Sequence, residues 1–196
     1  PYTVSFGLRR SSEVTADYGF GPYYSGSDTE IRTLDFEVGR DVNLGRAGAG
    51  RLTLGLRGAR IGQSSASTSY YGYPFYSYGT SYGDSTFTGA GPRVAIEGST
   101  PIGASNVSLD WEAGAAVLFG TTDSYGGGSY GGYGSSSEST EVINLDLSAA
   151  LSYMITPNAT VSLGVKAEQF RNLDLNFGST DEIISRGAFL KFTAKF

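Results

Sequence analysis

Asp110 and Glu112 are the residues whose types and spacing come closest to a catalytic pair. They lie two positions apart in the alternating segment Val107–Phe119, so a β-strand places both on one face, and paired carboxylic acids can hydrolyse glycosidic bonds. The chain contains no histidine and no cysteine, which removes the commonest general base, the commonest metal ligand and any disulfide. The sequence therefore predicts no enzyme, with no catalytic residue, no cofactor and no metal site.

The composition of the 196 residues excludes two further classes of protein. A net charge of −5 offers no basic stripe to neutralise phosphates, so we expect no nucleic-acid partner. No uncharged apolar run approaches the roughly 18 residues of a membrane-spanning helix. A membrane protein of this composition must therefore cross the bilayer as a β-barrel. We expect a secretion signal on the precursor.

The elements that position these residues are predicted to be strands, because apolar and polar side chains alternate with a period of two. This pattern predicts an all-β fold, an eight-stranded antiparallel transmembrane (outer-membrane) β-barrel with an up-and-down meander. The alternative is a soluble sandwich or lipocalin-like barrel, but many alanines on the apolar parity and strand lengths of about 10 to 14 residues favour the membrane. The alternating segments are Tyr2–Arg10, Ile31–Val42, Arg51–Ile61, Thr86–Glu97, Val107–Phe119, Ile143–Tyr153, Val161–Glu168 and Ile184–Phe196.

The last segment carries a signal of its own. Leu190, Phe192 and the terminal Phe196 share one parity, whereas Lys191 and Lys195 share the other. A closing strand that ends in an aromatic residue resembles the C-terminal signal read by the outer-membrane insertion machinery, so we predict that Phe196 is the insertion signal. The protein is then expected in the outer membrane of a Gram-negative bacterium.

Connections between the segments alternate in length. Residues 1–196 are predicted to form a single barrel domain, with long extracellular loops at about 11–30, 62–85, 121–140 and 173–182. Short turns are expected at 43–50, 99–106 and 155–159. Long outer loops and short inner turns are typical of outer-membrane barrels, and they place both termini on the periplasmic side.

The predicted loops are rich in glycine, serine and tyrosine. Tyrosine supplies a large amphipathic contact surface at low rotamer cost, which indicates loops that bind a partner. The alternative is that the loops are neutral and hydrated and only shield the mouth of the barrel. We favour contact, with outer-membrane lipid and lipopolysaccharide, and through the loops with glycans, neighbouring barrels or a surface-assembly protein. The predicted contact residues are Tyr23, Tyr24, Tyr70, Tyr71, Tyr73, Tyr76, Tyr78, Tyr82, Tyr125, Tyr130 and Tyr133.

The inward parity collects charges of both signs, which would be costly to expose to lipid. Antiparallel register places Arg93 beside Glu112, Arg57 beside Asp35 and Glu37, and Lys191 near Lys166 and Glu168. Because an eight-stranded barrel is just wide enough to be filled by side chains, we expect a paired and largely plugged interior, with a narrow water path as the alternative. The predicted interior network is Arg9, Asp35, Glu37, Arg57, Arg93, Glu97, Asp110, Glu112, Asp146, Lys166, Glu168 and Lys191.

One proline interrupts the expected pattern. Pro92 lies within the fourth segment, and proline removes a ladder hydrogen bond from a sheet. We therefore predict a bulge or local break around Gly89–Pro92.

Several stretches carry a family resemblance: Leu34–Gln63 (with GLRGAR), Phe87–Gly103 (with GAGPRVAIEG) and LFG at Leu118–Gly120. They resemble the Legionella-type major outer membrane protein family of pore-forming barrels. The resemblance implies a Gram-negative outer-membrane location and a porin role. The residues themselves favour a small barrel acting in cell-surface structure or contact, including as a subunit of a larger assembly. The alternative is a passive porin for small solutes or ions.

Overall fold

The computed structural model describes residues 2–18, 24–43, 49–71, 77–103, 105–129, 131–157, 159–173 and 182–194. These residues form strands, and no helix among them is long and apolar enough to cross a membrane. The strands are β1 (Tyr2–Tyr18), β2 (Tyr24–Asn43), β3 (Ala49–Tyr71), β4 (Ser77–Pro101), β5 (Val107–Gly128), β6 (Gly131–Thr156), β7 (Ala159–Arg171) and β8 (Glu182–Ala194).

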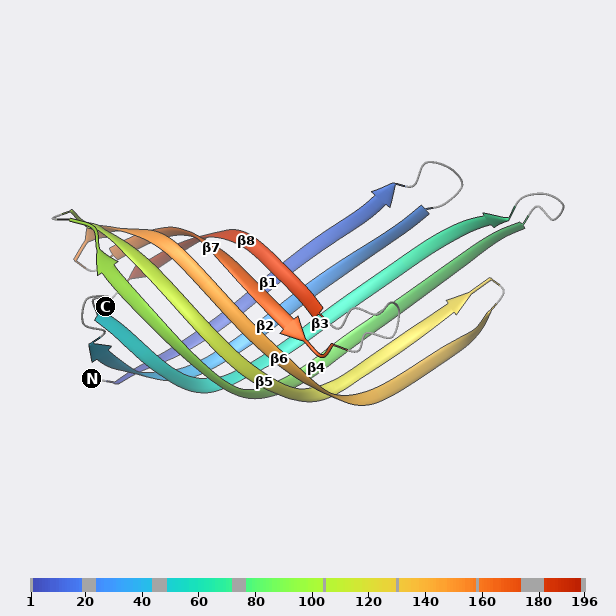
Figure 1. The fold of residues 1–196 in the computed structure, drawn as a ribbon, viewed down its shortest axis with the longest axis horizontal. Coiled ribbons are helices and arrows are strands. Elements are labelled where there is room, and N and C mark those ends of the chain that lie inside the picture. The colour runs from blue at the N-terminus through green and yellow to red at the C-terminus, as the bar shows by residue number, and fades with distance from the viewer. Residues whose placement is uncertain are drawn as a thin grey trace.

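The strands form one antiparallel sheet in which each strand pairs with the next along the chain, in the order β1-β2-β3-β4-β5-β6-β7-β8 (Figure 1). The predicted all-β antiparallel meander is therefore confirmed for the described residues. The sheet twists and coils strongly, as the right-handed twist of long strands requires. The hairpins β1–β2, β3–β4 and β5–β6 extend beyond the ends of the shorter β7 and β8 (Figure 1).

The prediction of long loops at about 11–30, 62–85 and 121–140 was wrong over most of these residues, because strand pairing continues through them. Register is kept as far as Tyr18↔Tyr24 between β1 and β2, and Tyr71↔Ser77 between β3 and β4. Between β4 and β5, Ser85 and Ser124 hydroxyls lie 2.9 Å apart. Segments rich in serine and glycine can be either loops or paired strands, and here cross-strand hydroxyl pairs and ladder hydrogen bonds stabilise them as sheet. Of the fourth predicted loop, 174–181 lies outside the described residues.

The predicted break at Pro92 is present. Pairing between β4 and β5 passes from Ala90↔Phe119 to Arg93↔Ala116 without a pair for Gly91 or Pro92. A Cβ at Gly91 would lie 1.8 Å from the carbonyl oxygen of Val117, so only glycine permits the backbones to approach so closely. The register is the same on both sides of the gap, which makes it a local break rather than a bulge.

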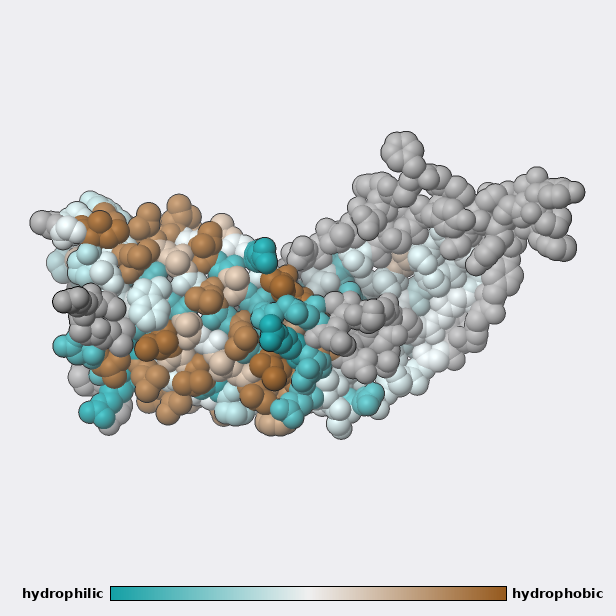
Figure 2. Space-filling view, in the orientation of Figure 1, coloured by the Kyte–Doolittle hydropathy of each residue, from teal (hydrophilic) through white to brown (hydrophobic). Residues whose placement is uncertain are grey.

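The outer face of the sheet exposes large apolar side chains, whereas charged side chains are buried on the inner face. On the outer face, large apolar side chains are exposed: Leu54 by 62%, Leu163 by 64% and Leu190 by 75%. On the inner face, Arg57 is 0% exposed. Figure 2 shows hydrophobic residues over the outer surface around β7 and β8, bordered by hydrophilic residues where the long hairpins begin. We call the exposed set the apolar band: Leu34, Phe36, Val38, Leu52, Leu54, Leu56, Val94, Leu109, Phe119, Ile143, Leu145, Leu147, Leu151, Leu163, Val165, Leu190 and Phe192.

Replacing Leu145 with Arg tests this band. The variant should lose about 2–4 kcal/mol of unfolding free energy in lipid vesicles, because the charge must enter hydrocarbon. Ser139→Arg is the matched control, since Ser139 is exposed on the same face of β6 but lies beyond the band. Equal losses in urea titrations of the two variants would contradict the assignment of the lipid-facing surface.

Candidate functional site

The inner face of the sheet is organised around two arginines, Arg57 on β3 and Arg93 on β4. Arg57 donates two hydrogen bonds to Asp35, at 2.6 and 2.8 Å, and others to Asp146 at 2.7 Å and Glu168 at 3.1 Å. A guanidinium suits this position, because its planar fork presents five donors to surrounding carboxylates.

Arg93 shares one of these carboxylates. Its Nη2 lies 2.8 Å from Glu112 and 2.8 Å from Asp146, and its Nη1 donates to Glu37. Room for this guanidinium comes from Gly114 on β5, since a Cβ there would lie 2.5 Å from Arg93 Nη2. We call this set, with Lys166 at 3.7 Å from Asp146, the ionic layer: Asp35, Glu37, Arg57, Arg93, Glu112, Asp146, Lys166 and Glu168.

The ionic layer shows that the sheet is rolled. Arg57 belongs to β3 and Glu168 to β7, which are separated by three intervening strands in the sheet. In a flat sheet, β3 and β7 would lie about 19 Å apart, at roughly 4.8 Å per strand, which is farther than the two side chains reach. Their contact at 3.1 Å therefore requires β3 and β7 to face each other across the interior.

A second group of polar residues lies further along the same face, toward the β4–β5 turn. Asp110 accepts hydrogen bonds from Ser99 at 2.6 Å, Ser108 at 3.0 Å and Ser152, and Ser152 contacts Ser162 at 2.7 Å. We call these five residues the hydroxyl layer. Asp110 and Glu112 thus share a face as predicted, but they serve different layers, so each carboxylate is occupied by its own partners.

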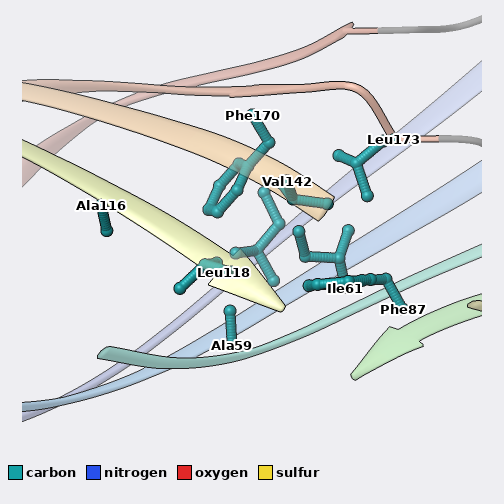
Figure 3. Close-up of a cluster of buried hydrophobic side chains, with 9 residues drawn as sticks. Ala59, Ile61, Phe87, Ala116, Leu118, Val142, Phe170 and Leu173 are labelled. Atoms are coloured by element: carbon teal, nitrogen blue, oxygen red, sulfur yellow. The ribbon is translucent and has the colours of Figure 1, made fainter. Parts of the chain in front are cut away.

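On the other side of the ionic layer, toward the long hairpins, the interior becomes apolar. We call this group the apolar layer, and Figure 3 shows its labelled side chains converging from several strands. Phe87, Phe170, Ile61, Leu118 and Val142 are each 0% exposed. Its members are Ile31, Ala59, Ile61, Phe87, Ala116, Leu118, Val142, Phe170 and Leu173, with Ile183 packed against them.

Sequence reasoning missed the apolar layer although a signal for it existed. Leu118 has the parity of Glu112, Phe170 has the parity of Glu168, and Ile61 has the parity of Arg57. Large apolar residues on the inward parity near the ends of the predicted segments indicate a packed layer inside the rolled sheet. Asn144 was missed as well; it accepts a hydrogen bond from Arg57 and donates one to the backbone oxygen of Gln169 at 3.2 Å.

Some residues of the predicted interior network do not belong to the ionic layer. Glu97 contacts Arg51 at 3.3 Å, at the end of the sheet near the short turns, rather than the ionic layer. In the register Lys191 is opposite Ser162 and Lys166 is opposite Gly187, so the proximity of the Lys191 side chain to Lys166 and Glu168 stays a prediction. The sequence could not fix this register, since the connection between β7 and β8 is long. The side chains of Arg9 and Lys191 lie outside those described.

Of the predicted contact tyrosines, the structure describes the side chains of Tyr82 and Tyr125. They are exposed on neighbouring strands of the β4–β5 extension, with ring centroids 6.2 Å apart and planes at 41°. The described residues contain no cluster of His, Cys, Asp or Glu arranged to hold a metal ion. The remaining predicted positions lie outside the described side chains: Tyr23, Tyr24, Tyr70, Tyr71, Tyr73, Tyr76, Tyr78, Tyr130, Tyr133 and Phe196.

Comparison with known proteins gives a family match. A family model described as Legionella pneumophila major outer membrane protein precursor matches residues 7–178. The matched residues include every stretch on which the family resemblance rests. No curated protein matches the chain.

Replacing Arg57 or Arg51, which both lie on the inner face of β3, compares the loss of buried ion pairs with the loss of partly exposed ones. Arg57→Ala should cost about 3–5 kcal/mol of unfolding free energy, because it leaves Asp35, Asp146 and Glu168 buried with fewer partners. Arg51→Ala should cost less than about 1 kcal/mol, since its ion pairs with Asp41 and Glu97 are partly exposed. Denaturant titration in vesicles measures both, and similar losses would show that the ionic layer is not the main polar contribution to stability.

Proposed function

The chain belongs to the Legionella pneumophila major outer membrane protein family, and from the packing of its interior we propose that it is a closed outer-membrane barrel that does not conduct. Family membership makes it an outer-membrane protein. In this proposal the barrel is an anchor, and its work is done by the long hairpins that it holds at the cell surface.

Closure of the barrel would come from pairing between β1 and β8. The contact between Arg57 on β3 and Glu168 on β7 supports it, because the sheet is already rolled across its middle. The apolar layer supports it too, since it draws side chains from β2 to β7 and from Ile183 on β8. An open edge in hydrocarbon would leave backbone groups without hydrogen bonds, at several kcal/mol each, whereas closure satisfies them.

The observation that carries the non-conducting proposal is the complete burial of the largest side chains of the apolar layer. Phe87, Phe170 and Ile61 come from β4, β7 and β3, and each is 0% exposed. Beneath them the ionic layer fills the interior with buried charged side chains, and a barrel of about 8 strands has little further room. A hydrated ion would have to displace packed apolar side chains as well as break ion pairs.

The hairpins β1–β2, β3–β4 and β5–β6 support a role in contact. They extend past β7 and β8, carry many hydroxyl side chains and expose Tyr82 and Tyr125. We propose that these extensions lie outside the cell and both termini in the periplasm, as short turns at the opposite end favour. Their partners would be glycans, neighbouring barrels or a surface-assembly protein, reached through tyrosine rings and hydroxyl groups.

The second candidate is a passive porin, which one observation favours. The Glu112 side chain is 35% exposed although it pairs with Arg93, so water reaches one side of the ionic layer. A water path from there to the hairpins would require the apolar layer to open. The two functions therefore differ in whether ions pass through the resting barrel.

Planar-bilayer recording distinguishes the anchor from the porin. The purified chain should show no steady conductance, because two layers of packed side chains block the interior. Glu112→Ala should stay silent and unfold at a lower temperature, since Arg93 loses a partner inside the barrel. Steady single-channel currents from the wild-type chain, with Glu112→Ala changing ion selectivity but not melting temperature, would reject the anchor and favour the porin.

A further inference from the structure

Arginines stand opposite one another on consecutive strands at one place on the outer face. In the register, Arg10 on β1 is opposite Arg32 on β2, and Arg32 is opposite Arg60 on β3. The side chains of Arg32 and Arg60 are both exposed. Directly opposed residues on one face have Cβ atoms about 4.5–5.5 Å apart, and like charges at that separation destabilise a sheet. A bound anion would offset this repulsion between the arginine side chains.

Arg32 and Arg60 lie at the border of the apolar band. On β2, Arg32 immediately precedes the exposed residues Leu34 and Phe36 on the same face, and on β3, Arg60 follows the exposed Leu56. Beyond the arginines, toward the hairpin ends, polar residues take over. The border of a lipid-facing band is the level of lipid headgroups, where long cationic side chains extend toward the polar phase.

Carboxylates near the pair do not balance it. Arg32 donates to Glu30 at 2.9 Å from Nη2 and 3.0 Å from Nε, so one carboxylate serves this guanidinium. Arg60 makes no hydrogen bond or ion pair with any residue that the structure describes. A guanidinium fork that is free to bind matches the oxygens of a phosphate group in two parallel hydrogen bonds.

We infer that Arg32 and Arg60 form a docking site for the phosphate group of a phosphorylated lipid headgroup in the outer leaflet. The acyl chains of such a lipid would lie on Leu34, Phe36 and Leu56, directly below the guanidinium groups. This continuity of cationic and apolar surface fits an amphiphile better than a free anion. The inference rests on the proposed orientation, with the hairpins outside, because phosphorylated lipid A occupies the outer leaflet.

The matched control is Arg40, at the other end of the apolar band. It is exposed on the same face of β2, but its cross-strand neighbour on β3 is Leu52 rather than a second arginine. Arg40→Gln therefore removes one exposed guanidinium from the same strand without touching the proposed site. Glu30→Gln is a second informative change, because it removes the carboxylate that competes with phosphate for Arg32.

Native mass spectrometry of the full chain in neutral detergent tests the site, with bisphosphorylated and dephosphorylated lipid A as probes. The Arg32→Gln, Arg60→Gln double variant should bind bisphosphorylated lipid A about tenfold more weakly than wild type, as expected for lost charge-assisted hydrogen bonds. Arg40→Gln should leave binding within about twofold, Glu30→Gln should strengthen it, and dephosphorylated lipid A should not distinguish wild type from the double variant.

Three results would overturn the inference: undiminished binding by the double variant, an equal loss in Arg40→Gln, or full competition by inorganic phosphate, which would indicate a site for the free anion. Circular dichroism of each variant establishes that it is folded. The assay measures binding in detergent and does not depend on conductance, so a failed docking site and a failed anchor proposal give different results.

Discussion

A guanidinium group with no exposed surface imposes the strongest constraint in this structure. Removing an ion from water costs several kcal/mol, so Arg57 must be surrounded by carboxylates that compensate for its lost hydration. Those carboxylates come from Asp35 on β2, Asp146 on β6 and Glu168 on β7. Because β6 and β7 are distant from β3 in the sheet, the ion pairs form when the sheet rolls up. The ionic layer therefore links side-chain electrostatics to the curvature of the whole fold.

The outer face follows from the same constraint. With the ionic layer gathered inside, the outward positions of the apolar band are left to leucine, isoleucine, valine and phenylalanine, which a bilayer accommodates and water does not. The interior then divides along each strand into hydroxyl, ionic and apolar layers. On β5 this order is visible from Asp110 through Glu112 to Leu118. The apolar layer fills its section of the interior with buried hydrophobic side chains, and it separates the ionic layer from the hairpin end.

Sequence reasoning recovered the faces because a period of two fixes which side chains share a side. It also placed Arg57 beside Asp35 and Arg93 beside Glu112, since the short turns between these strands leave little freedom in register. Glu37, which was predicted beside Arg57 as well, contacts Arg93 instead. It did not recover the length of the hairpins, because serine- and glycine-rich segments can be either mobile loops or paired strands. The position of Lys191 depended on the long connection before β8. The apolar layer was missed because inward positions were assumed to be polar.

A double-mutant cycle between Arg57 and Glu168 tests the rolled, ion-paired interior most directly. The two residues belong to strands that do not pair, so a coupling between them reports the contact across the interior. Unfolding free energies in vesicles of wild type, Arg57→Ala, Glu168→Ala and the double variant should give a coupling of about 1–3 kcal/mol. Additive losses, within about 0.5 kcal/mol, would show that the two side chains do not interact and would contradict a rolled sheet organised around the ionic layer.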